Sequence, residues 1–261
     1  MNPSFFTSIL NGYLPEPHAS LLNGILFGIP LKTSPLFYLE LKRVGLLHLV
    51  VLSGMNITII GSLVAVLTSR FAQPLRIFLS IAMIIVFILF VGPAPPIVRA
   101  GIMGVLPLIA VLTGRKSTAL INLLFSIILI AIFVPSWLPT LSFQLSVGAT
   151  LGIILFLKQE GGHSFFHFIQ QELRTSLSAQ VFTAPLIFIA FKQISFISPV
   201  ANILVSFLIT PLMILGFLTS LLGSVNYFLG LPTAVICYGL LIYMVAVIHI
   251  LSTLPYVFVQ F

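Results

Sequence analysis

Long apolar runs separated by short polar connections make up most of the chain. Residues 81–91 read IAMIIVFILFV, and residues 121–134 read INLLFSIILIAIFV. A membrane β-strand would alternate apolar and polar residues, whereas these continuous runs predict helices that are apolar on every face. Because a spanning helix needs about 20 residues, the chain has room for about eight spans. We place them at residues 44–68, 75–91, 97–113, 119–134, 141–157, 179–191, 199–222 and 232–251.

Two segments do not follow this pattern. In residues 163–178 an apolar residue recurs every third or fourth position from Phe166 to Leu177, which predicts an amphipathic helix in the plane of the membrane interface. A re-entrant hairpin leading into the sixth span is the alternative. Residues 1–43 contain an apolar stretch too short to span, so we expect an N-terminal interfacial segment there, followed by a transmembrane domain at 44–261.

The composition excludes a water-soluble domain. Hydrophobic residues make up 59% of the chain and charged residues only 6%, with 11 Lys or Arg, four Glu and no Asp. Soluble domains carry about a quarter charged residues, so this chain could not cover its folded surface with solvated groups. Its single Cys237 cannot form an intrachain disulfide. We therefore predict an all-α, polytopic transmembrane helix bundle.

Helix-breaking residues lie inside three of the predicted spans, at Gly54, Pro107 and Pro211. Interrupted helices at membrane depth are tolerated where the backbone is buried in protein or lines a wet cavity, and they are the best sequence indication of a transport path. Proline and glycine are also common in ordinary membrane helices. One such residue alone therefore indicates little, whereas three favour a path through the bundle.

Polar side chains at membrane depth form the second set of candidates. Because such groups are costly in hydrocarbon, they usually face the interior of a bundle. A lone Asn or Gln can simply bond a neighbouring helix, but a guanidinium is always charged and needs a partner or water, which sets Arg99 apart. The candidates that line or shape a path are His48, Ser53, Gly54, Asn56, Arg99, Gln144, Gln180 and Asn202.

Catalytic chemistry has no support in the sequence. His163 and His167 have helical spacing but no adjoining carboxylate of a zinc-protease motif, and His48 and Ser53 are five residues apart, on different faces of a helix. No nucleotide-binding loop is present. We expect no enzymatic activity, no catalytic residues, no metal site and no cofactor.

Five segments form an ordered series of motifs along the chain. The first two read LPE…ASLLNGILFG within 14–28 and GLLHLVVLSGMNITII at 45–60. A third, at 95–114, carries an Arg-Ala pair after a proline-rich turn, and a fourth contains the sequence FQLS at 143–146. The fifth reads SLSAQVFTAPLIF and SPVANILVSFLITPLMIL within 176–215. Together these segments cover nearly the whole chain, and they resemble the membrane "competence" domain of ComEC/Rec2-type competence proteins.

The resemblance implies a multi-pass protein of the inner (cytoplasmic) membrane that guides single-stranded DNA into the cell during natural transformation. Family members often carry an OB-like domain and a metallo-β-lactamase-like domain, which have no counterpart in this sequence. We therefore expect separate nuclease, DNA-receptor and cytoplasmic motor proteins as partners. About eight helices are few for enclosing a strand of DNA. A homodimer is therefore an alternative to a monomer.

Two other function classes remain open from the residues alone. The same helix breaks and Arg99 would suit a secondary transporter of a small anionic solute or a lipid, which needs a closed pocket at the midplane rather than a continuous path. A non-conducting structural subunit of an uptake complex would need no path of its own. The net charge of +7 does not separate these classes, because any inner-membrane protein carries excess Lys and Arg.

Overall fold

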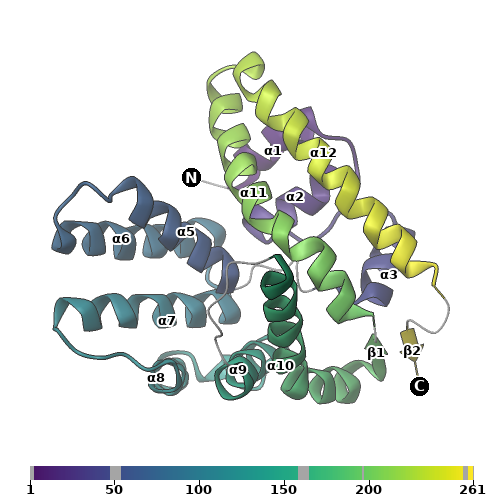
Figure 1. The fold of residues 1–261 in the computed structure, drawn as a ribbon. Helices are drawn as coiled ribbons and strands as arrows, with labels where there is room; N and C mark the ends of the chain where they lie inside the picture. Colours follow the sequence, from purple (N-terminus) through teal and green to yellow (C-terminus); the bar gives the residue numbers. More distant parts are fainter. Residues whose placement is uncertain (1–2, 48–53, 158–164, 196, 255–257, 261) are drawn as a thin grey trace. The chain divides into compact units, whose positions relative to one another are not determined.

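Helices form nearly all of the secondary structure in the computed structural model, which describes residues 3–47, 54–157, 165–195, 197–254 and 258–260 (Figure 1). Within these ranges the strands are β1 (Gln193–Ser195) and β2 (Phe258–Gln260), which pair antiparallel. The all-α class is therefore confirmed. The helices are α1 (Pro3–Tyr13), α2 (His18–Phe27), α3 (Pro35–Val44), α5 (Gly54–Leu67), α6 (Gln73–Val91), α7 (Pro95–Leu112), α8 (Ala119–Phe133), η1 (Pro135–Trp137), α9 (Leu141–Phe156), α10 (Phe165–Phe191), α11 (Ser198–Val225) and α12 (Tyr227–Ser252).

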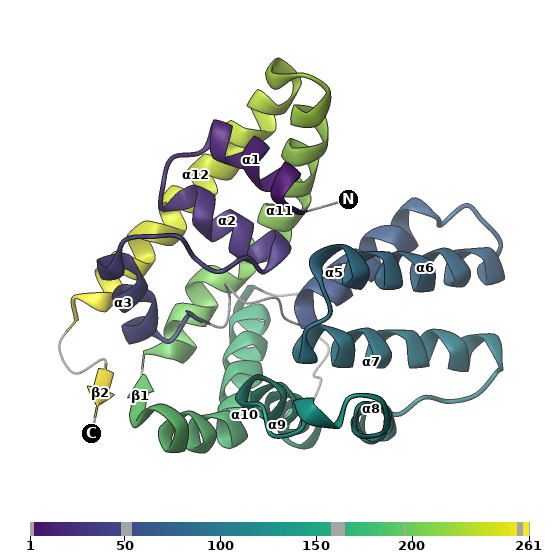
Figure 2. The same cartoon turned by 180° about the vertical axis from the view of Figure 1, so that it is seen from behind.

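The described part of the chain divides into two compact units. Unit 1 comprises residues 1–52, 160–176 and 192–261, and unit 2 comprises residues 53–159 and 177–191. In unit 1 the antiparallel pair α11 and α12 packs against α1, α2 and α3 (Figure 2). In unit 2, α5, α6 and α7 pack against one another, and α8 and α9 follow (Figure 1).

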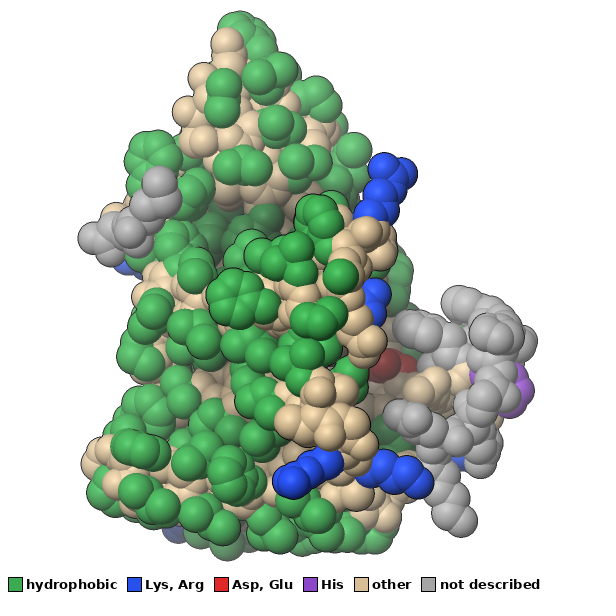
Figure 3. All heavy atoms as spheres, turned by 90° about the vertical axis from the view of Figure 1, so that its left-hand side faces the viewer, with side chains coloured by type: hydrophobic (Ala, Val, Ile, Leu, Met, Phe, Trp, Pro, Cys, Tyr) green, Lys and Arg blue, Asp and Glu red, His purple; other side chains and the backbone are tan. Residues whose placement is uncertain are grey.

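Hydrophobic side chains point outward from both units, as a lipid environment requires. On α8 the buried positions include the polar Asn122 and Ser126, whereas Phe125, Ile132 and Phe133 are exposed. This arrangement reverses that of a soluble helix and suits hydrocarbon, where polar groups turn inward. Figure 3 shows mostly hydrophobic side chains on the surface in view, with few Lys and Arg among them.

Within the described residues, five helices are long and apolar enough to cross a membrane: α6, α7, most of α10, α11 and α12. Four of them, α6, α7, α11 and α12, coincide with predicted spans to within a few residues. By contrast α5, α8 and α9 have 14, 15 and 16 residues, fewer than the about 20 that a hydrocarbon core requires. The figure of about eight spans therefore stays a prediction.

The predicted interfacial helix at 163–178 and the sixth span at 179–191 are one continuous helix, α10, over the described residues 165–191. The sequence between Phe165 and Ala184 contains no Gly or Pro, so nothing in it ends the helix at residue 178. This corrects the division into two elements, and it also rules out a hairpin turn within residues 165–191.

Two of the predicted helix breaks are not breaks. Helix α7 continues through Pro107 and α11 continues through Pro211, because a proline removes only one backbone hydrogen bond and the turns on either side persist. Gly54 is the first described residue of α5, so a helix break at this position stays a prediction. The preceding residues 48–53 lie outside the described part of the chain.

The N-terminal segment belongs to the bundle of unit 1. Every residue of α2 from Ala19 to Phe27 is buried. The helix reaches α11 at Gly216, where an added Cβ would lie 2.8 Å from Cδ1 of Leu26. An interfacial location of residues 1–43 stays a prediction, and the structure adds that α2 itself is enclosed by protein.

Tyr13 fastens α1 to the turn between α11 and α12. Its hydroxyl donates to the Tyr227 carbonyl oxygen at 2.6 Å, and the two rings stack at 4.6 Å. We expect Tyr13→Phe to lower the free energy of unfolding by about 1 kcal/mol, because it removes one hydrogen bond and keeps the ring. Thermal unfolding in detergent measures this. Tyr38→Phe, on an exposed side chain of α3, is the control, and equal effects of both variants would contradict the assignment.

Candidate functional site

Arg99 lies in the second turn of α7, buried inside unit 2. Pro95 and Pro96 begin this helix, where their missing N–H groups cost nothing. The side chain is only 4% exposed. A guanidinium at this depth must be held by polar neighbours, and these come from α9 and from α7 itself.

The partners of Arg99 are all neutral. Its Nε and Nη2 donate to Oγ of Ser146 at 3.0 and 2.7 Å, and Nη1 contacts Sδ of Met103 at 3.0 Å. Among the described residues no carboxylate pairs with this guanidinium. A buried cation without a counter-charge is costly, so its positive potential is available to an anion that comes near.

The first described turn of α5 packs against α7 at the residue that follows Arg99. A Cβ added to Gly54 would be 3.3 Å from Cβ of Ala100, the residue after Arg99. Asn56, two residues further along α5, is buried. The structure therefore packs α5 against α7 at Gly54 and Ala100, and a path shared by Gly54, Asn56 and Arg99 stays a prediction. His48 and Ser53 lie outside the described residues.

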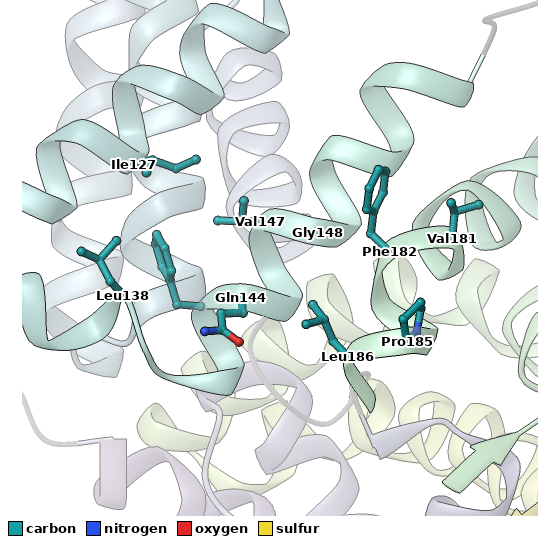
Figure 4. Close-up of a pocket in the computed structure, with 10 residues that line it drawn as sticks. Ile127, Leu138, Gln144, Val147, Gly148, Val181, Phe182, Pro185 and Leu186 are labelled. Atoms are coloured by element: carbon teal, nitrogen blue, oxygen red, sulfur yellow. The ribbon is translucent and has the colours of Figure 1, made fainter. Parts of the chain in front are cut away.

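Gln144 faces a different part of unit 2. It lines a cavity of about 470 Å³ together with residues of α8, α9 and α10 and with Leu138, and the other nine lining residues are apolar or glycine (Figure 4). Ser146 follows two positions later on α9, about 200° around the helix, and it contacts Arg99. Gln144 therefore lies on the opposite face of α9 from the Ser146 side chain that contacts Arg99. Gln180 is half-buried on α10, next to Val181 and Phe182, which line the same cavity.

Asn202 belongs to unit 1, on α11. Its Nδ2 donates to Oγ of Ser176 at 2.9 Å. Its buried Oδ1 has no partner in the described part of the chain, and the same holds for Oγ of Ser206 one turn later. The two atoms form a short polar stripe that can take hydrogen bonds from a further group.

Three polar residues of these sites were not predicted. Ser146 holds Arg99, Ser176 holds Asn202, and Ser206 extends the stripe on α11. Ser146 ends the FQLS sequence quoted above, and Ser206 is four residues from Asn202. Both positions could have indicated a polar contact, but serine is too common in membrane helices to stand out.

Comparisons with known proteins agree with this arrangement of segments. The chain is 30% identical over 203 residues to an uncharacterised protein of Aquifex aeolicus (strain VF5), covering 76% of this chain and 46% of that protein. It is 24% identical over 221 residues to ComE operon protein 3 of Bacillus subtilis (strain 168), covering 81% of this chain and 28% of that protein. It thus spans less than half the length of either relative. No solved structure matches.

A family model described as "Competence protein" matches residues 25–261. That range includes α5 with Gly54 and Asn56, the Arg99 region of α7, and Asn202 on α11. It covers most of the chain, and the resemblance identified from the five sequence segments is confirmed. The chain belongs to the competence protein family.

Proposed function

We propose that this membrane protein forms a channel that guides single-stranded DNA across the inner (cytoplasmic) membrane during DNA uptake. The observation that carries the proposal is the buried, uncompensated charge of Arg99. Membership of the competence family supports a role in DNA uptake. About eight passes would complete the bundle, with α5, α8 and α9 making up the shorter ones.

Arg99 acts in this proposal through its field. Because the side chain is 4% exposed, a phosphate passing the wall of the path would meet its potential without displacing Ser146. At a separation of about 6 Å and an effective dielectric constant of about 20, the attraction is about 3 kcal/mol. That value lowers the barrier for an anion and is too small to trap it, as conduction requires.

The stripe on α11 would serve the bases rather than the phosphates. The unpartnered Oδ1 of Asn202 accepts hydrogen bonds, so it cannot bind a phosphate oxygen but can receive an amino group of a base or a water. Such contacts are independent of sequence, as a channel for arbitrary DNA needs.

The proposal assigns the protein no enzymatic step. Single-stranded DNA would be supplied by a separate nuclease and DNA receptor, and a cytoplasmic motor would pull the strand. The chain could act as a monomer or as a homodimer, which would enclose a wider path. The lipid bilayer is the remaining partner.

Reconstitution tests the proposal directly. Purified protein in liposomes should admit fluorescent single-stranded DNA to an internal quencher and exclude a duplex of equal length. Liposomes without protein provide the baseline. Equal entry of DNA with and without the protein would refute the channel and leave the structural-subunit function. In that case deletion of the protein would still abolish uptake in cells, although the purified protein conducts no DNA in liposomes.

The cavity around Gln144 favours one alternative, a lipid-handling transporter. Its volume of about 470 Å³ and its apolar lining suit an acyl chain. This reading predicts movement of labelled lipid between leaflets in protein-containing liposomes and no entry of DNA. The same preparation therefore distinguishes the two functions.

A further inference from the structure

A small polar cavity lies in unit 1, away from all the residues considered above. It opens between α1, α2 and the segment after α2, and its volume is about 80 Å³. One water occupies about 30 Å³ in the liquid, so the cavity has room for a group of two or three heavy atoms. Its polar lining consists of Thr7, Asn11, Glu16, Ser20, Asn23 and Lys32.

Asn23 gives this cavity an unsatisfied acceptor. The residue is only 5% exposed, on the otherwise apolar helix α2. Its Nδ2 donates to Oδ1 of Asn11 at 2.8 Å, but its buried Oδ1 has no partner among the described residues. Buried polar atoms are almost always hydrogen-bonded, so this oxygen calls for a donor in the cavity, either a water or a group of a ligand.

Two opposite charges line the same cavity. Glu16 accepts one hydrogen bond, from the backbone N–H of Ser20 at 3.3 Å, and an ionised carboxylate can accept about four. The hydroxyl of Ser20 donates to the Lys32 carbonyl oxygen at 3.0 Å, which fixes the backbone of Lys32 beside the cavity. Within the described residues Glu16 and Lys32 form no ion pair, so both charges are available.

We propose that this cavity binds the ethanolamine headgroup of phosphatidylethanolamine. The primary ammonium would enter and donate to Oδ1 of Asn23 and to the Glu16 carboxylate, and the lipid phosphate would pair with Lys32 at the exposed rim. Two methylene groups separate the two charges of this headgroup, which suits opposite charges that line one small cavity. The lipid bilayer around this membrane protein supplies the ligand at high local concentration.

Other occupants satisfy fewer of these groups. A choline headgroup has no N–H and cannot satisfy Asn23. A phosphatidylglycerol headgroup could pair with Lys32 and donate a hydroxyl to Asn23, but it has no cation to pair with the Glu16 carboxylate. A divalent metal needs several oxygen ligands and would meet the positive charge of Lys32 beside a single carboxylate.

Thermal unfolding of the purified full chain in detergent tests the proposal. Six-carbon-chain phosphatidylethanolamine should raise Tm saturably, by about 3–5 °C at ten times its half-saturating concentration. The matching phosphatidylcholine and phosphatidylglycerol should give no saturable shift at that concentration. Equal shifts with all three lipids would overturn the proposal. Phosphoethanolamine without acyl chains should need a higher concentration, and an equal half-saturation would overturn the lipid as the source.

Variants of the lining residues complete the test. Glu16→Gln should raise the half-saturating concentration of phosphatidylethanolamine by about tenfold or more, because one hydrogen bond between charged groups is lost. Asn23→Leu should abolish the preference for phosphatidylethanolamine, whereas Asn23→Asp, which keeps an acceptor, should retain it. Glu172→Gln removes an equal charge from α10 and is the control. Unchanged lipid preference in Glu16→Gln would overturn the site, even if Asn23→Leu fails to fold.

Discussion

Replacing Arg99 with glutamine should lower DNA uptake by about a hundredfold. This follows from the loss of about 3 kcal/mol of attraction for a phosphate in the path, since each 1.4 kcal/mol changes a rate about tenfold. The variant should still fold. Glutamine can keep a hydrogen bond to Ser146, and removal of a buried charge that lacks a counter-charge does not destabilise a protein.

Transformation frequency with marker DNA in the native host measures this effect, alongside the amount of variant protein in the membrane. Arg115→Gln, an exposed residue of the same unit, removes an equal charge and should leave uptake within twofold. Arg99→Lys keeps the charge and should lose less than Arg99→Gln. Uptake by Arg99→Gln equal to wild type, at equal protein level, would show that this cation has no part in transport.

Gly152→Ala should destabilise unit 2, although alanine is the better helix former. Gly152 is buried on α9, and a Cβ there would overlap the backbone carbonyl oxygen of Ser178 on α10 and lie 3.0 Å from its carbonyl carbon. A backbone oxygen cannot rotate away as a side chain can. We expect a loss of about 2 kcal/mol from this overpacking, which exceeds the gain of about 1 kcal/mol in helix propensity.

Gly61→Ala is the matched control for this prediction. Gly61 also lies in a helix of unit 2, and a Cβ added to it meets nothing within 4 Å. The same substitution should therefore raise stability there by up to about 1 kcal/mol. Thermal unfolding in detergent should show Tm moving in opposite directions for the two variants. A higher Tm for Gly152→Ala would mean that α9 and α10 do not approach as closely as the structure has them.

The helical membrane class could be predicted because it depends on composition and run length. Helices α6, α7, α11 and α12 follow apolar runs that no other structure would accommodate in a membrane. Their ends were less certain, and the effect of proline was overestimated. Pro107 and Pro211 lie inside continuous helices, because their cost depends on neighbouring turns and not on the residue alone.

The membership of the site was only partly predictable. Arg99 stood out because its charge is always present, and Gly54 of α5 packs against Ala100, the residue after Arg99. Gln144 does not lie beside Arg99. It shares α9 with Ser146 but faces the apolar cavity. Sequence spacing does not tell which of two polar residues on one helix faces a given neighbour.

By itself the sequence determined that this protein is a helical membrane protein and that it belongs to a competence family. It also identified Arg99 as the charge that is most costly to bury. Each of these depends on residue type and local order, which the chain carries wherever it folds. The tertiary structure decided which neutral groups hold Arg99, since Ser146 is 47 positions away. It also decided that Asn23, Glu16 and Lys32 share a cavity, because only packing brings side chains from separate elements to one place.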